Sequence, residues 1–177
     1  MLFRSIRRFI CDDLCKRLVK SLVLNHIDYC STILFGVCDF EIAKMQRVQN
    51  AAAKLVLNLK KFDSATAALK QLHWLPIKWR IKFRVACMVF KCLHNDAPEY
   101  LKELLEIEKP TRILRSNSCN DGVVSLKIPF CRRYTFYSRS FAVSGPTTWN
   151  SLPTEIRLAQ NIDTFKVRFK TFYCSQA

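Results

Sequence analysis

The stretch "IKWRIKFRVACMVFKCLHN", Ile77 to Asn95, is the part of the sequence that most clearly decides the fold. Two apolar stripes run along it at the three- and four-residue spacing of an α-helix. One stripe contains Ile77, Ile81, Val85, Met88 and Cys92, and the other contains Trp79, Phe83, Ala86, Phe90 and Leu93. Because the combined apolar face is broad, we expect this helix to pack against more than one neighbour.

Segments on both sides of this stretch also have helical spacing. Residues 12–24 carry Leu14, Leu18 and Leu22 at four-residue intervals, with Cys15 and Val19 beside them. Asp39 is a predicted N-cap for a long helix, and shorter helices are expected at 66–72 and after the capping-box spacing of "DAPE", 96–99. Residues 25–36 could continue as a helix or turn into a strand. The long helix has a predicted buried stripe of Ile42, Met45, Val48, Gln49, Ala52, Leu55, Val56 and Leu59.

The composition changes at Lys109, where "KPTRILRSNSCNDG" is polar, basic and typical of a connector. "VVSLKIP", 123–129, alternates as a short strand does, and Asp163 is a predicted cap of a last helix, with Ile162 and Val167 placed for a hydrophobic staple. The sequence therefore predicts a mainly α chain. A helical bundle spans residues 1–108, and a small α+β tail with a short strand pair and a terminal helix spans 109–177.

The run "GPTTWNSLPTEIR", Gly145 to Arg157, could mark the lip of an active site or a packing corner. Trp149 and Leu152 are apolar anchors, and the two prolines of the run fix the backbone around them. No group in the run has a plausible base or nucleophile as its partner. We therefore expect a corner that seats the terminal helix.

The net charge is the strongest functional signal in the composition. The 177 residues contain 29 Lys and Arg against 14 Asp and Glu, a formal charge of +15. Such an excess favours a polyanionic partner, first nucleic acid and second an anionic membrane surface, although basic residues can also form only a solvated surface. The predicted contacts with RNA or DNA are Lys44, Arg47, Lys54, Lys78, Lys82, Arg132, Arg133 and Arg139.

Three of these residues lie in "CRRYTFYSRSF", 131–141, where basic and aromatic residues alternate. Arginines there could contact phosphates while aromatic rings stack on bases. The same pattern fits a strand with one apolar and one charged face, and the sequence does not separate the two.

The nine cysteines and three histidines do not predict a metal site. No C-x-x-C pair occurs, and structural zinc sites need closely spaced ligand pairs. No secretory signal and no apolar run of about 18 residues is present, which predicts an intracellular chain, in cytoplasm or nucleus, with reduced thiols and no membrane span. The oligomeric state is not predicted.

"FICDDLC", 9–15, resembles the aromatic-x-Asp-Asp box in which polymerases hold two metal ions. Ile10 stands where the aromatic residue should be, and a helix follows at once, so Asp12 and Asp13 are predicted as cap and first-turn acids. His26, His73 and His94 stand singly, and we expect structural roles for them, with His73 satisfying a buried backbone group or packing under a Trp. No catalytic residue, metal ligand or cofactor is predicted.

Four phrases then carry a resemblance to a known family: "NHIDYCSTILFG" (25–36), "KMQRVQNAAAKLV" (44–56), the run 69–105, and "SFAVSGPTTWNSLPTEIRLAQNIDTFKVRFKTF" (140–172). In this order and spacing they closely resemble the C-terminal end of reverse transcriptases from jockey-like non-LTR retrotransposons, over about residues 4–172. The resemblance implies a thumb-like helical region and the tail that follows it. The magnesium-dependent palm of the parent enzyme would lie upstream, so that this chain would be a truncated copy or a fragment.

These observations together predict a non-catalytic remnant of an RNA-directed DNA polymerase that contacts RNA or DNA without sequence choice. The alternative is a protein-interaction module that docks on the missing polymerase palm through an exposed apolar face.

Overall fold

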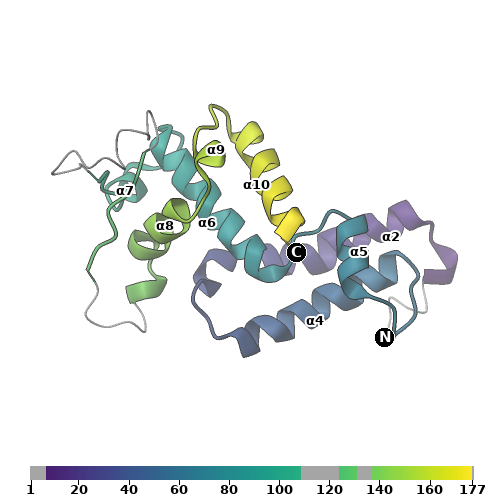
Figure 1. Ribbon diagram of the computed structural model, residues 1–177. Helices are drawn as coiled ribbons and strands as arrows, with labels where there is room; N and C mark the ends of the chain where they lie inside the picture. The colour runs from purple at the N-terminus through teal and green to yellow at the C-terminus, as the bar shows by residue number, and fades with distance from the viewer. Residues whose placement is uncertain (1–6, 109–123, 131–136, 177) are drawn as a thin grey trace. The chain divides into compact units, whose positions relative to one another are not determined.

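The computed structural model describes residues 7–108, 124–130 and 137–176, and over these residues the chain is mainly helical (Figure 1), as predicted. It divides into two compact units, one formed by Met1–Ser31, Val37–Arg80 and Tyr173–Ala177 and the other by Thr32–Gly36 and Ile81–Phe172. The division falls inside helix α6 (Ile77–Leu93). The boundary predicted at residue 109 lies outside the described residues and stays a prediction.

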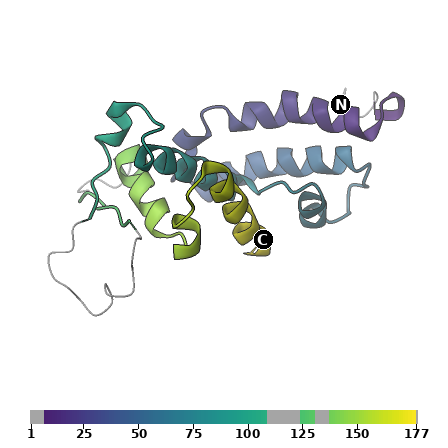
Figure 2. The ribbon, with the colours of Figure 1, turned by 90° about the horizontal axis from the view of Figure 1, so that it is seen from above.

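The first unit is built on a helical hairpin. Helix α2 (Asp12–Val19), the π-helical segment η2 (Lys20–Leu24) and α3 (Asn25–Asp28) follow one another without a break, after the short 3-10 helix η1 (Arg7–Phe9). They run beside α4 (Asp39–Val56) in the opposite direction (Figures 1 and 2), and α5 (Ala65–Gln71) packs on α4. Their buried core contains Cys15, Val19, Leu24, Ala52, Ala53, Val56, Ala68, Leu69, Leu72 and Trp74.

Residues 25–36, which the sequence left open between helix and strand, contain two short helices and no strand among the described residues. They comprise α3 and the 3-10 helix η3 (Ser31–Leu34). Arg80 of α6 holds the end of α3 through two bonds to the carboxylate of Asp28, 2.5 Å from Nε and 3.0 Å from Nη2. Both side chains are mostly buried, so the paired geometry fixes how α3 meets the first turn of α6.

A buried polar link joins α4 to α6 in the same unit. Gln49 is fully buried, and its side-chain amide donates to the carbonyl of Leu75 at 2.9 Å. Gln46 donates to the side chain of Gln49 at 3.0 Å and accepts from the backbone N–H of Ile77 at 2.8 Å. The first N–H groups of a helix have no partner within it, and Gln46 satisfies one of them.

The second unit is held by aromatic packing between α6 and α10 (Ile162–Gln176). The ring of Phe165 lies 4.8 Å from Phe90, and the ring of Phe169 lies 5.2 Å from Phe83, measured between centroids. Trp149 stacks on Phe165 at 5.9 Å, and Trp149 and Leu152 are buried. The predicted packing corner at 145–157 is thus confirmed. Most of it is helical, since it lies in α8 (Phe141–Asn150) and α9 (Thr154–Arg157).

Gly145 lets α8 approach α6 closely. A Cβ atom at this position would lie 3.1 Å from Cγ2 of Val89, which is tighter than ordinary van der Waals contact. The short helices α7 (Glu99–Lys102) and η4 (Tyr137–Arg139) belong to the same unit. "DAPE" does not cap α7, because Pro98 occupies the N-cap and makes no side-chain capping bond.

The expected strand pair in the tail is not confirmed. Within the described residues, the "VVSLKIP" segment forms an isolated antiparallel bridge between Leu126 and Ile107. Two backbone bonds flank it, from Glu108 N to Ser125 O at 2.9 Å and from Lys127 N to Glu106 O at 2.8 Å. The backbone N–H and carbonyl of Leu126 are bonded by the side chain of Asn150.

Several predicted details of the helices are wrong: two N-cap residues are off by one position, and two valines expected to pack are exposed. Cys11 and Cys38 occupy the N-caps of α2 and α4, so Asp12 and Asp39 are first-turn acids and not caps. Acids in the first turn remain favourable because the N-terminus of a helix carries partial positive charge. Val48 is 52% exposed rather than buried, and Val167 is 64% exposed, so the predicted staple with Ile162 is not formed.

Candidate nucleic-acid interface

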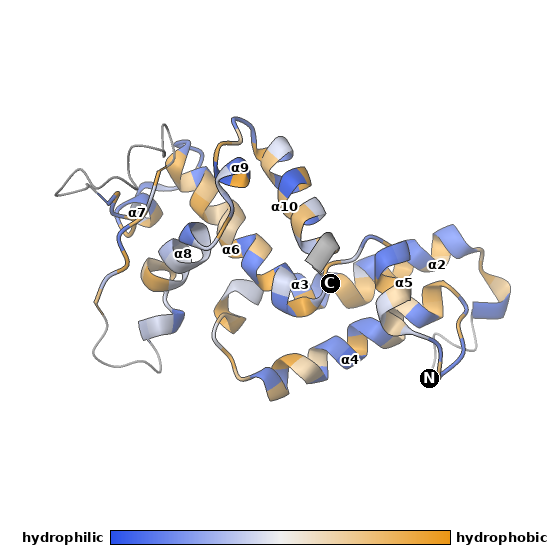
Figure 3. Cartoon of the chain, in the orientation of Figure 1, coloured by the Kyte–Doolittle hydropathy of each residue, from blue (hydrophilic) through white to orange (hydrophobic). Residues whose placement is uncertain are grey.

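The exposed side of α4 carries three of the predicted phosphate contacts. Lys44, Arg47 and Lys54 follow Phe40 by 4, 7 and 14 residues, a spacing that places all of them on one side of a helix. We call Phe40, Lys44, Arg47, Ala51 and Lys54 the α4 basic face. The buried residues Gln49, Ala52, Ala53 and Val56 lie on the opposite side of the same helix. Figure 3 colours the cartoon by hydropathy and shows hydrophilic and hydrophobic residues alternating along α4.

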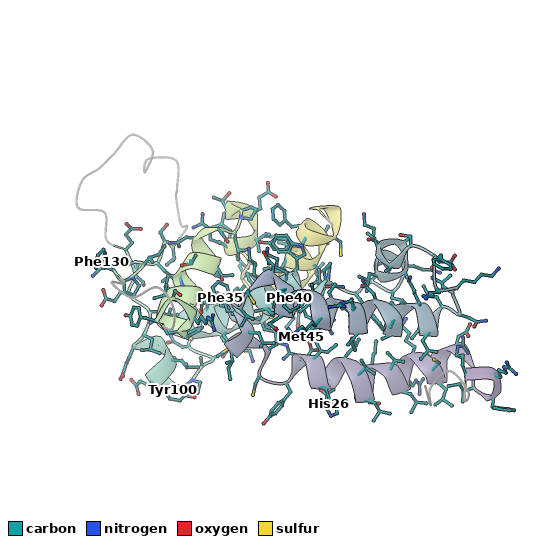
Figure 4. All side chains as sticks on the ribbon, turned by 90° about the horizontal axis from the view of Figure 1, so that it is seen from below. His26, Phe35, Phe40, Met45, Tyr100 and Phe130 are labelled. Carbon is teal, nitrogen blue, oxygen red and sulfur yellow. The ribbon has the colours of Figure 1, made fainter. Side chains whose placement is uncertain are left out.

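The cations of the α4 basic face form few interactions with the other described residues of the chain, and these lie near the surface. Lys44 pairs with Glu41 at 2.8 Å, and its Nζ lies 4.5 Å from the ring centroid of Phe40, which is labelled in Figure 4. Lys54 donates to the backbone carbonyl of Lys61 at 2.8 Å. Arg47 is exposed and forms no ion pair or hydrogen bond with another described residue. Because exposed ion pairs contribute little energy, these charges remain available to an external anion.

Lys78 belongs to α6, and its side chain lies near the start of α4. Its Nζ is 3.3 Å from the carboxylate of Asp39, the first residue of α4, and both side chains are mostly exposed. The structure therefore brings four predicted contacts to α4 within the first unit. Counted along the helix axis, Lys44 and Lys54 are separated by about 15 Å.

The other predicted contacts do not join this group. Lys82 is half-buried and engaged in an interaction, and Arg139 is exposed, and both belong to the second unit. The stem of Arg139 packs over Gly36, since a Cβ there would lie 3.2 Å from Arg139 Cγ. Arg132 and Arg133 lie outside the described residues, so the choice between a stacking platform and a strand at 131–136 stays open.

The Asp-Asp pair at the start of α2 is occupied by arginines. Asp12 forms an ion pair with Arg7, and Asp13 pairs with Arg17 at 2.9 Å. Arg7 also donates to the carbonyls of Leu55 and Val56, so that the guanidinium ties α2 to the end of α4. Among the residues that the structure describes, no group of three or more His, Cys, Asp or Glu side chains could hold a metal ion.

Two histidines have clear surroundings. His94 stacks on Phe90 with ring centroids 3.9 Å apart, and its Nδ1 lies 2.9 Å from the carbonyl of Phe90, which agrees with a structural role at a helix end. His73 is exposed and has a positive φ of 53°. The expectation that its imidazole satisfies a buried backbone group or packs under a Trp is therefore wrong.

Sequence reasoning also missed a set of cations that α6 and α10 bring together: Arg84, Lys91, Lys166 and Lys170. A signal exists in the sequence, since each of these residues directly follows one of the aromatic residues Phe83, Phe90, Phe165 and Phe169. Finding it requires knowing that these aromatic residues face one another.

Comparison with known proteins gives no relative for this chain: no family model, curated protein or solved structure matches it. In the described part of the chain, every helix is too short or too polar to cross a bilayer.

Proposed function

We propose that the chain is a non-catalytic, nucleic-acid-binding region related to the C-terminal part of jockey-like non-LTR reverse transcriptases. It contacts RNA or DNA through the phosphate backbone and without sequence choice. The observation that carries the proposal is the α4 basic face of a chain with a net charge of +15, where exposed Lys44 and Arg47 and half-buried Lys54 lie along one side of a helix.

The chemistry of this face suits phosphate rather than base recognition. Lysine ammonium groups and an arginine guanidinium along one helix can meet successive phosphates, which position a nucleic acid but carry no sequence information. Phe40 is 65% exposed beside Lys44, and an exposed ring next to a cation can stack on an unpaired base. The family resemblance supports the same assignment, because a reverse transcriptase handles an RNA template and a DNA product.

No polymerase chemistry is proposed for this chain. The acidic residues that most resemble a polymerase box, Asp12 and Asp13, are each paired with an arginine at the start of α2. The parent enzyme would use magnesium in its palm, and no residue here is assigned to that ion.

Fluorescence anisotropy at two or more salt concentrations tests the proposal. Replacing Lys44 and Arg47 by Gln removes two charges from the α4 basic face. With duplex DNA, we expect the slope of log K against log salt to become shallower by about 1.8, since each lost phosphate contact removes about 0.9.

The matched control is the double variant Lys20→Gln/Lys70→Gln, which also removes two charges but lies on η2 and α5, away from the α4 basic face. We expect a nearly unchanged slope for it. The proposal fails if the wild-type chain does not bind RNA or DNA at low salt, or if the control variant changes the slope as much as the α4 variant does.

The second candidate, a protein-interaction module that docks on a polymerase palm, is favoured by one observation. On α2 and η2, Leu14 is 44% exposed and Leu22 is 50% exposed, and Leu18 between them is half-buried. Large apolar residues aligned on an exposed helix face are typical of docking surfaces. Self-association of the purified chain that added nucleic acid does not change would favour this candidate.

A further inference from the structure

Within the second unit, α6 exposes a narrow basic stripe. Ile81, Val85, Ala86, Val89, Phe90 and Cys92 are buried. Arg84 and Lys91 are exposed, and Cys87 lies half-buried between them. The spacing of three and then four residues places these three side chains on one line, which spans about 10 Å of the helix.

A second basic stripe on α10 borders the first. Lys166 and Lys170 directly follow Phe165 and Phe169, whose rings pack on Phe90 and Phe83 of α6. Helices α6 and α10 lie side by side (Figure 1). The Nζ of Lys170 lies 5.6 Å from the ring centroid of Phe83, so this lysine reaches across to α6. We call Arg84, Lys91, Lys166 and Lys170 the α6–α10 seam.

The cations of the α6–α10 seam lie close enough to the thiol of Cys87 to affect its pKa. Burial raises the pKa of this thiol to about 11, while the positive charges of Lys166, Lys91, Arg84 and Lys170 act in the opposite direction. All four cations therefore act on one sulfur atom from two different helices. Asp163 bonds Lys166 at 3.0 Å and is largely exposed, and such a pair leaves the lysine available.

The aromatic packing makes the seam a fixed feature rather than a chance gathering of flexible side chains. Phe165 and Phe169 are fully buried, and they set the distance and the register between α6 and α10. Positive charges held near one another on two packed helices repel, and an anion that binds beside them relieves this repulsion.

We propose that the α6–α10 seam is a second phosphate-binding surface, which contacts the phosphodiester backbone of RNA or DNA. The inference rests on the proposed function and assigns it to residues in the other unit of the chain. A membrane surface offers phosphate too, but binding there also needs apolar side chains that insert into the interface. Among the described residues of α10, Val167 is the one large apolar side chain that is exposed beside these lysines.

The test uses the double variant Lys166→Gln/Lys170→Gln in the full chain, titrated against a duplex DNA and a single-stranded RNA. We expect weaker binding at low salt and a salt slope that is shallower by about 1.8 for the duplex and about 1.4 for the single strand. Lys20→Gln/Lys70→Gln removes the same charge and should keep the wild-type slope. Lys166→Arg/Lys170→Arg keeps the charge, and it should also bind as the wild type does, provided that its circular dichroism matches.

Each other outcome contradicts the inference in a recognisable way. If Lys44→Gln/Arg47→Gln weakens binding and the seam variant behaves as the control does, the inference is wrong and the proposed function stands. If the wild-type chain does not bind nucleic acid at low salt, both are wrong. If the seam variant loses binding to phosphatidylserine vesicles but keeps its nucleic-acid slope, the seam belongs to a membrane surface.

Discussion

At the scale of single residues, Asn150 shows how one side chain can stand in for a missing strand. Its Oδ1 accepts from the backbone N–H of Leu126 at 3.0 Å, and its Nδ2 donates to the carbonyl of Leu126 at 2.7 Å. Next to it, the indole of Trp149 donates to the carbonyl of Val124 at 2.9 Å. The end of α8 thus satisfies the backbone that an additional strand would otherwise bind.

Replacing Asn150 by Ala should destabilise the chain by about 2 kcal/mol, because it leaves the N–H and the carbonyl of buried Leu126 without partners. Urea denaturation measures the loss. Gln160→Ala is the matched control at an exposed amide, and we expect a change below about 0.5 kcal/mol. Equal stability of the two variants would show that the bonds to Leu126 contribute nothing.

At the scale of elements, α2 illustrates a choice that the sequence pattern leaves open. Two stripes run along it, Leu14–Leu18–Leu22 and Cys15–Val19, and the more hydrophobic leucines look like the core. The structure buries Cys15 and Val19 instead. They belong to the same buried cluster as the small residues Ala52 and Ala53 of α4, and small side chains let two helices approach closely.

The two faces of α2 predict opposite responses to the same substitution. Val19→Gln should cost several kcal/mol, because it places an amide without a partner in a packed core. Leu22→Gln should cost less than about 1 kcal/mol, since its side chain is already half in water. Thermal unfolding followed by circular dichroism compares the two variants. A larger loss for Leu22→Gln would mean that the leucine face is the buried one.

How far the sequence predicts this fold depends on the range of the interactions. The long helices at 39–56 and 77–93, the short one at 65–71 and the buried corner at Trp149 follow from local spacing, and they are confirmed. Contacts across long separations cannot be read from spacing. Arg80 binds Asp28 and Gln46 binds the N–H of Ile77, and neither pairing leaves a local pattern.

The same distinction between local spacing and long-range contacts applies to the candidate nucleic-acid contacts. The α4 basic face was predictable because a single helix sets its spacing, and Lys44, Arg47 and Lys54 do share one side. The α6–α10 seam depends on which aromatic rings meet between two helices. The paired rings Phe90–Phe165 and Phe83–Phe169 are 75 and 86 residues apart in the chain, far beyond the range of local pattern reasoning. Lys82 looked equivalent to Lys78 in the sequence, yet it is half-buried.

At the scale of the whole molecule, the charge of +15 should govern how stability responds to salt. Like charges destabilise the compact state by mutual repulsion, and ions screen this repulsion when the Debye length falls from about 30 Å at 0.01 M to about 10 Å at 0.1 M. For the chain alone, we therefore expect the midpoint of thermal unfolding to rise as sodium chloride is added over this range.

A nucleic acid that binds the folded chain should reverse this dependence. At low salt, duplex DNA at 100 times its Kd would add about 2.7 kcal/mol to the free energy of unfolding, and the midpoint should be highest there. Added salt weakens the phosphate contacts, so the midpoint in the presence of DNA should fall towards that of the chain alone. Differential scanning fluorimetry at matched salt, with and without DNA, gives both curves. A midpoint that rises with salt in both series would show that DNA does not bind the folded chain, because only binding to the native state can reverse the sign.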